Sequence, residues 1–219
     1  IYKKGHLLSS VSNARLFDEF CKIFLNGMAE KNFNKLVSFG LNKYLVSTNL
    51  NGCEFSNQLI IEALRNTDNR IKNNQSVTPG FLIAALLWPQ LIKKSLKGNE
   101  INLKKFFRSM DSILRNQQKI TAIPRKFHTY IKDIWVLQLK LHSRIGRQPY
   151  KTLKHPRFRA AYDFLLVREK ATAKTKDLGF WWTEFQKNNE DLKKKLINDL
   201  KKNNLEESSK IFGFSKELR

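Results

Sequence analysis

The sequence contains few cysteines, few acidic residues and no long apolar run, and each shortage excludes a class of protein. Among 219 residues there are 2 cysteines, Cys21 and Cys53, which we expect to be reduced structural thiols. The longest apolar run, FLIAALLWP at 81–89, is too short to span a bilayer. Residues 1–12 lack the apolar segment of a secretory signal. We therefore expect a cytoplasmic protein that does not act on membranes.

The motifs that phosphate-processing enzymes need are also missing. Paired carboxylates that hold metal ions would appear as D-x-D or as clustered acids in an apolar setting, and neither occurs. There is no glycine-rich phosphate loop, and the 4 histidines are not spaced as metal ligands with one another or with the cysteines. From these residues alone we predict no metal site and a binding module.

The positive charge is large and unevenly distributed. The chain carries 41 Lys and Arg against 19 Asp and Glu, a formal net charge of +22, which indicates a polyanionic partner. Residues 115–159 hold 12 of these cations and a single acid, Asp133. A surface adapted only for solubility would mix both signs to limit self-repulsion. This segment is therefore the first candidate for contact with nucleic-acid phosphates.

Apolar residues recur at the 3.6-residue period of helices through most of the chain, and strand signals are nearly absent. The predicted fold class is all-α, an irregular array of many helices. Ser12 and the pair Thr78-Pro79 are helix start signals, and Pro89 should kink or end the apolar helix that Thr78 opens. The expected helices cover residues 13–26, 30–39, 57–73, 79–96, 102–119, 124–144, 148–153, 156–170, 177–188 and 190–203, with a loop at 47–55 and a frayed end.

The long helix expected from residue 124 separates a basic face from an apolar face at about 100° per residue. The basic side carries Arg125, Lys132, Lys140 and Arg147, with Arg144 beside them. The apolar side carries Phe127, Tyr130, Ile131, Ile134, Leu137 and Leu141. We predict that the apolar side packs on the core and that the basic side contacts phosphates. An ordinary solvated face is the alternative.

Aromatic side chains could stack on unpaired bases, but at helical spacing most of them are expected in the core. Trp135 lies between the apolar and basic faces, and Tyr150 lies in an expected basic loop. These two are the candidates for base stacking.

The stretch KHPRFRAAYDFLLVREK at 154–170 combines an expected helix start at Pro156 with a first turn full of cations. A helix N-terminus normally favours acidic residues, whereas a phosphate there would meet free N–H groups, the helix dipole and the cations together. We therefore predict a phosphate contact at this helix end. An ion pair between Arg159 and Asp163, four residues apart, is the alternative for that arginine.

Seven stretches together resemble the C-terminal half of bacterial poly(A) polymerases, class II nucleotidyltransferases related to the CCA-adding enzymes. Their order and spacing fit this family over about residues 6–186. They are SNARLFDE at 12–19, NTDNRI at 66–71, VTPGFLIAALLWP at 77–89, AIPRKF at 122–127, DIWVLQLKL at 133–141, HPRFRAAYDFLLVR at 155–168 and WWTEFQ at 181–186.

The resemblance implies a division of the chain. In this family an α/β head carries the catalytic residues, a helical neck helps to hold ATP, and a helical body and leg grip RNA. By resemblance, residues 1–27 are the end of the neck, 28–186 are the body and leg with the RNA-binding region, and 187–219 are a Lys-rich C-terminal helix and tail, where the family often has an Arg-rich tail. The head is expected to precede this chain, as the first residue, Ile1, also indicates.

The resemblance also implies a function for the whole protein, the addition of adenylate from ATP to RNA 3′ ends with Mg²⁺. No ATP or Mg²⁺ ligand can be assigned to this chain, which should be inactive alone. The candidate RNA-binding residues are Arg125, Lys126, Lys132, Lys140, Arg144, Arg147, Lys151, Lys154, His155, Arg157 and Arg159. The alternatives are a free-standing basic adaptor without catalysis, a fragment of a CCA-adding enzyme and, less favoured, a protein that docks on anionic membranes. The sequence upstream of Ile1 would separate the adaptor from the enzyme.

Overall fold

The computed structural model describes residues 4–47, 54–98, 100–172 and 176–202, and this part of the chain is mostly helical. The α-helices are α1 (Asn13–Phe24), α2 (Ala29–Ser38), α3 (Glu54–Lys72), α4 (Pro79–Ser95), α5 (Leu103–Gln118), α6 (Arg125–Leu141), α7 (Gln148–Leu153), α8 (Phe158–Thr172), α9 (Lys176–Lys187) and α10 (Glu190–Lys202). The other elements are two 3-10 helices, η1 (Gly5–Ser10) and η2 (Asn42–Tyr44), and an antiparallel hairpin of β1 (Leu96–Lys97) and β2 (Glu100–Ile101). The predicted all-α class is confirmed.

The two helix start signals act as the sequence predicts. The Ser12 hydroxyl accepts a hydrogen bond from the N–H of Arg15 at 3.4 Å, and the Thr78 hydroxyl accepts one from the N–H of Phe81 at 3.4 Å. Pro79 is the first residue of α4, where its missing N–H removes no helical hydrogen bond. Both caps fix where a helix enters the core.

Several expected boundaries are wrong. Of the two effects expected of Pro89, a kink or an end of the helix, the end does not occur, because α4 continues to Ser95 with the proline buried inside it. α6 ends at Leu141 rather than at 144, and α8 begins at Phe158 rather than at Pro156. The short hairpin after α4 was not expected.

The expected loop at 47–55 is only partly correct. Residues 54 and 55 already belong to α3, and 48–53 lie outside the described residues.

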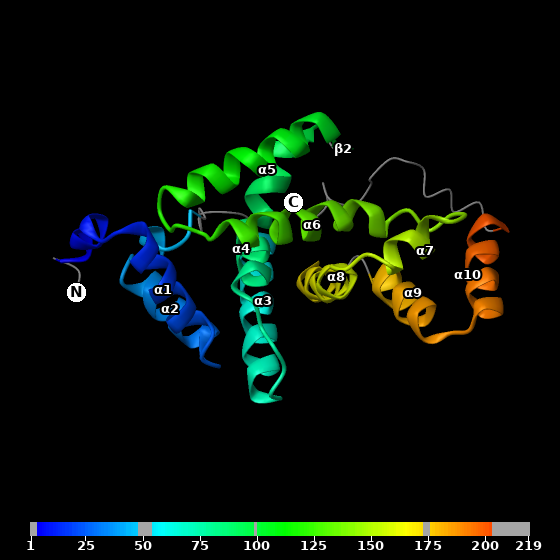
Figure 1. Ribbon diagram of the computed structural model, residues 1–219, viewed down its shortest axis with the longest axis horizontal. Helices are drawn as coiled ribbons and strands as arrows, with labels where there is room; N and C mark the ends of the chain where they lie inside the picture. Colours follow the sequence, from blue (N-terminus) through cyan, green and yellow to red (C-terminus); the bar gives the residue numbers. More distant parts are fainter. Residues whose placement is uncertain (1–3, 48–53, 99, 173–175, 203–219) are drawn as a thin grey trace.

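The helices form an elongated array (Figure 1). α1 and α2 lie at one end, α9 and α10 lie at the other, and α6 runs along the middle. α3 packs against both α4 and α8, and α6 packs against α4, α7 and α8. α6 and α8 therefore join the two ends of the array.

The apolar interior consists of two clusters. The larger one is centred on α4, most of whose residues are buried, and includes Trp88 and Trp135. The smaller one lies between the ends of α6 and α8 and the helices α9 and α10, and includes Trp181 and Trp182. Both α6 and α8 contribute side chains to each cluster.

A close helix crossing positions α6 against α4. A Cβ atom on Gly80 would lie 2.8 Å from Cδ1 of Tyr130 and 3.1 Å from Cδ1 of Phe127. Glycine at this position therefore lets the first turn of α4 touch the aromatic rings of α6.

A charged side chain is buried where α8 meets α4 and α6. The Arg168 guanidinium donates to Oε1 of Gln138 at 3.0 Å and lies 4.9 Å from the centre of the Trp88 ring. Gln138 in turn donates to the carbonyl of Ala161 at 2.9 Å. Since a buried charge must be paired to be tolerated, this network fixes how α8 sits on the core.

Candidate nucleic-acid interface

The turn between α7 and α8 carries the HPRFR motif and determines where α8 starts. Nδ1 of His155 accepts a hydrogen bond from the N–H of Arg157 at 3.1 Å, and the His155 carbonyl accepts one from the N–H of Phe158 at 2.8 Å. Two N–H groups that we expected to be free for a phosphate are therefore already bonded. These two N–H groups cannot bind a phosphate while they are bonded to His155, so the side chains around the turn are the better candidates for such a contact.

Arg157 is exposed and is the cation best placed for such a contact. Its guanidinium carbon lies 4.9 Å from the centre of the Tyr130 ring on α6. A cation–π contact orients the guanidinium but uses no hydrogen-bond acceptor, so the N–H groups of Arg157 are available to an anion.

Arg159 forms the ion pair with Asp163 that the sequence offered as the alternative to a phosphate contact. Its Nε lies 3.1 Å from Oδ1 of Asp163, and Arg70 on α3 lies 3.1 Å from Oδ2 of the same carboxylate. Burial raises the pKa of Asp163 above its ordinary value, although both guanidinium groups act in the opposite direction. The side chain of Arg159 is 72% exposed while that of Asp163 is 14% exposed, so Arg159 still presents positive charge to solvent.

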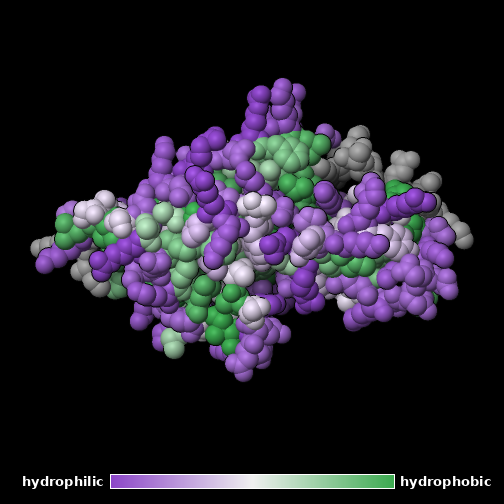
Figure 2. Space-filling model, in the orientation of Figure 1, coloured by the Kyte–Doolittle hydropathy of each residue, from purple (hydrophilic) through white to green (hydrophobic). Residues whose placement is uncertain are grey.

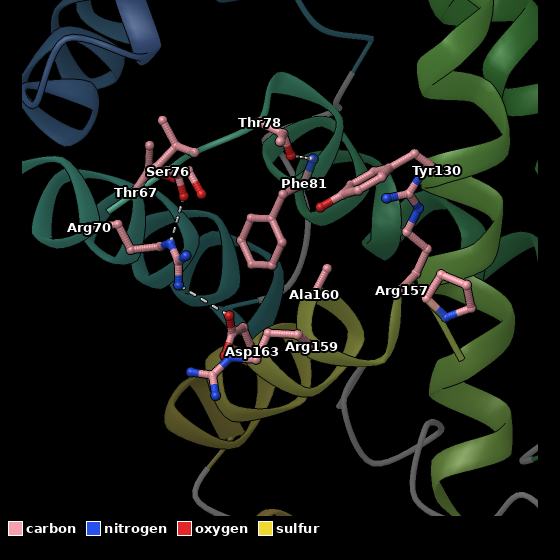
Figure 3. Close-up of a pocket in the computed structure, with 12 residues that line it drawn as sticks. Thr67, Arg70, Ser76, Thr78, Phe81, Tyr130, Arg157, Arg159, Ala160 and Asp163 are labelled. Carbon is pink, nitrogen blue, oxygen red and sulfur yellow. Dashed lines mark hydrogen bonds and ion pairs between the residues drawn. The ribbon is translucent and has the colours of Figure 1, made fainter. Parts of the chain in front are cut away.

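These residues surround a pocket of about 270 Å³ (Figure 3). Its walls come from four separate segments: α3, the Ser76–Phe81 segment, α6 and the start of α8. In Figure 3, Phe81 and the hydroxyl end of Tyr130 point into the pocket, with Arg157 beside Tyr130 and with Arg70 and Asp163 closing the opposite side. Arg70 also donates to the carbonyl of Ser76 at 3.1 Å, which ties α3 to the segment before α4.

The basic face expected on α6 is less continuous than the sequence predicts. Arg125, Lys126 and Lys140 are exposed. Lys132 forms an ion pair with Asp111 of α5 and is not a free cation. Because an acid on a neighbouring helix cannot be recognised from the pattern of one helix, the sequence missed this pairing.

The arginines after α6 do not extend the helical stripe, because α6 ends at Leu141. Arg144 is partly buried with its guanidinium 5.4 Å from the centre of the Trp181 ring, so it packs on the smaller core. Arg147 is exposed just before α7, and Lys151 and Lys154 are exposed on and just after α7. The exposed cations thus lie on α6, α7 and the start of α8 rather than on one helix.

Of the two predicted stacking residues, Trp135 is wrong because it is buried, and Tyr150 is half-buried. Trp135 is fully buried, and its Nε1 donates to the carbonyl of Ala84 at 2.9 Å. Tyr150 belongs to α7, not to a loop, and its ring packs edge-on against Phe185 with centroids 5.3 Å apart. A position at the border of two helix faces does not reveal whether a third element covers it.

The pocket includes residues that sequence reasoning did not assign to a site. Arg70 and Phe81 entered only as parts of the NTDNRI and VTPGF markers, Ser76 was not singled out, and Tyr130 was placed on the apolar face. An arginine inside a family marker on an otherwise amphipathic helix is the signal that could have pointed to Arg70.

Most of the visible surface is hydrophilic, with several smaller apolar areas (Figure 2), and the exposed apolar side chains of α5 include Leu103 and Phe107. No helix among the described residues is both long and apolar enough to cross a membrane. The same residues contain no group of three or more His, Cys, Asp or Glu side chains that could hold a metal ion.

Comparison with known proteins gives two family matches. Residues 99–211 match the model described as the polymerase A arginine-rich C-terminus. Residues 1–48 match the model described as the probable RNA and SrmB-binding site of polymerase A.

Several curated relatives are similar over nearly the whole chain. Poly(A) polymerase I of Salmonella typhimurium is 34% identical over 205 residues, which is 89% of this chain and 44% of the relative. Poly(A) polymerase I of Escherichia coli O6:H1 is 35% identical over the same shares, and that of Haemophilus influenzae is 34% identical over 88% of this chain and 45% of the relative. The chain therefore spans less than half the length of these relatives.

The family matches, the similarity to these relatives and the helical array with its exposed cations agree with one another. The chain belongs to the bacterial poly(A) polymerase I family and corresponds to its C-terminal, RNA-binding and arginine-rich portion.

Proposed function

We propose that this chain is the RNA-holding part of a poly(A) polymerase that adds adenylate from ATP to RNA 3′ ends. The strand behind the growing end would lie across the exposed cations of α6, α7 and the start of α8. ATP and Mg²⁺ would be bound by parts of the protein outside this chain.

One observation carries the proposal. Residues 115–159 hold 12 cations and one acid, and most of these cations are exposed in the structure. The exposed candidates are Arg125, Lys126, Lys140, Arg147, Lys151, Lys154, Arg157 and Arg159. Such a surface favours the phosphate backbone, whose recognition is tolerant of sequence and suits a tail made without a template.

The proposed division of the chain follows the same reasoning. We assign residues 1–27 to the end of a neck, 28–186 to the RNA-binding body and leg, and 187–219 to a Lys-rich C-terminal segment. α6, α7 and α8, which carry the exposed cations, all fall in the middle part.

The activity is tested on the full-length protein. Incubated with an RNA primer, Mg²⁺ and ATP alone, it should extend the 3′ end by many adenylates without a template. An enzyme that stops after a short product and requires CTP would instead be a CCA-adding enzyme. A gene that begins near Ile1 and a product that binds RNA without extending it would support the adaptor.

The role of this chain is tested by binding. The 219-residue chain should bind oligo(A) with a logarithmic affinity that falls linearly with the logarithm of salt concentration, by about 0.7 per contacted phosphate. Fluorescence anisotropy over a salt series measures the slope. An affinity for RNA that does not change with salt contradicts a phosphate-binding surface.

A further inference from the structure

We infer that the pocket between α3, α4, α6 and α8 receives one unstacked base of the bound RNA and prefers adenine to uracil. This inference rests on the proposed function, because it assumes that an RNA strand crosses the adjoining cations. It adds a base-reading position to a surface that otherwise contacts only phosphates.

The size of the pocket fits one base. Its volume of about 270 Å³ lies just below the range of about 300–1,000 Å³ typical of small-molecule sites. A duplex or a protein segment is too large for such a space, whereas a single base turned out of the strand is not. Proteins that read single-stranded RNA commonly splay bases out in this way.

The lining combines aromatic rings with groups that bind anions. Phe81 offers a ring surface on which a base can stack, whereas one face of the Tyr130 ring already carries the Arg157 guanidinium, and stacking is effective for any base. Arg157 and Arg159 lie at the start of α8 on the same pocket, where they can hold the phosphates that flank the base. A base and its phosphates could therefore be bound together without any change in the fold.

The polar groups discriminate between bases. The Asp163 carboxylate closes one side and accepts one contact on each oxygen, from Arg159 and from Arg70. A carboxylate has about four lone-pair positions, so it can still accept a hydrogen bond from an exocyclic amino group such as N6 of adenine. Uracil has no amino group, and its one ring donor on that edge, N3–H, lies between two carbonyl oxygens that the carboxylate would repel.

The Tyr130 hydroxyl is the second polar group that could contact the base. It points into the pocket in Figure 3 and makes no hydrogen bond to another residue in the described part of the chain. A hydroxyl can donate to or accept from a ring nitrogen of adenine. Asp163 and Tyr130 come from different helices, so a base could reach both only in the folded chain.

The test compares oligo(A) and oligo(U) of equal length by fluorescence anisotropy. We expect the unmodified 219-residue chain to prefer oligo(A) by about tenfold, the size of one stacking and hydrogen-bonding contact. Phe81→Leu removes a ring and Ala160→Phe fills the pocket, and each should abolish the preference while leaving affinity for oligo(U) and the salt slope unchanged. Lys140→Ala is the matched control, because it removes an exposed cation that does not line the pocket and should weaken both oligonucleotides equally.

The melting temperatures of both variants are measured, so that a loss of preference can be distinguished from unfolding. Equal affinity of the unmodified chain for the two oligonucleotides overturns the inference, as does a preference that survives in both folded variants. In either case salt-dependent RNA binding would persist and the proposed function would stand. Absence of any RNA binding would instead contradict the proposed function itself.

Discussion

Neighbouring cations of the 154–159 segment have different roles, which only the structure separates. His155 closes the turn before α8 by accepting the N–H of Arg157, and Arg159 is paired with Asp163. Arg157 has its side-chain donors available and is exposed. Composition identifies the segment as basic, but only the contacts of each side chain show which cations still have hydrogen-bond donors available for a phosphate.

The first prediction concerns Arg157. Arg157→Ala should weaken oligo(A) binding and lower the salt slope by about 0.7, because one phosphate contact is lost. The melting temperature should change little, since an exposed cation–π contact contributes only about 0.5–1 kcal/mol. Anisotropy over a salt series and thermal unfolding measure both effects. Lys97→Ala removes an exposed cation on β1 and is the control. An Arg157→Ala chain that melts at a lower temperature but keeps its affinity for oligo(A) would show that Arg157 has a structural role.

The second prediction concerns pH. Burial, followed by the charges of Arg168 and Arg144, lowers the pKa of His142 from 6.5 to about 3. The folded chain therefore keeps this ring neutral where the unfolded chain protonates it, so stability is complete above about pH 6.5 and falls as the pH falls toward 3. The loss from this one group is about 1.4 kcal/mol per pH unit, or about 2 kcal/mol between pH 6.5 and 5.

Urea unfolding at pH 7 and pH 5 measures this loss. His142→Gln should lose less stability than the parent chain between these two pH values. His6→Gln removes an exposed histidine of η1 and should behave like the parent. Equal losses in the parent and in His142→Gln would mean that another group causes the acid sensitivity.

At the scale of helices, the sequence predicted well which segments are helical, but it predicted the first and last residues of these helices less accurately. Ser12 and Thr78 fixed two helix starts because capping is local and depends on three or four residues. The start of α8 depends on the side chain of His155, and the continuation of α4 through Pro89 depends on packing from all sides. The pocket could not be predicted, because its walls lie in segments that are far apart in the sequence.

The third prediction concerns the contact between α8 and α9. The Glu169 carboxylate is buried and accepts the N–H of Gly179 at 2.7 Å, and a Cβ atom on Gly179 would lie 2.2 Å from the other carboxylate oxygen. Gly179→Ala should therefore destabilise the chain by about 1–3 kcal/mol, the usual cost of overpacking, despite the better helix propensity of alanine. Denaturant unfolding measures the change.

A second background tests the cause of that loss. If the clash is with Glu169, then Gly179→Ala should cost clearly less in a chain that already carries Glu169→Ala, because the obstructing carboxylate is gone. An equal cost in both backgrounds would place the strain at Leu166 of α8, whose Cδ2 would lie 2.7 Å from the same Cβ atom.

At the scale of the whole molecule, the net charge of +22 affects folding and binding in opposite ways. Self-repulsion among the cations destabilises the compact state. At physiological ionic strength, salt screens the repulsion between exposed charges that lie more than about 8–10 Å apart. The same screening weakens attraction to RNA.

The fourth prediction follows from this balance. Raising the salt concentration should raise the melting temperature of the free chain by a few degrees while lowering its affinity for RNA. Replacing Lys140 and Lys151, both exposed, by Gln should reduce both effects. Thermal unfolding and anisotropy in the same salt series provide the measurement, and a melting temperature that falls with added salt would show that attractive ion pairs outweigh the repulsion.

The position of α6 and α8 in both apolar clusters has a mechanical consequence. A force applied to a strand held at Arg157 is transmitted into α8 and, through Tyr130, into α6. Because each helix is anchored in two cores, the load spreads over the whole array instead of bending a single surface loop. If the proposed function holds, tension on an RNA strand bound at Arg157 should therefore move the helical array as one piece.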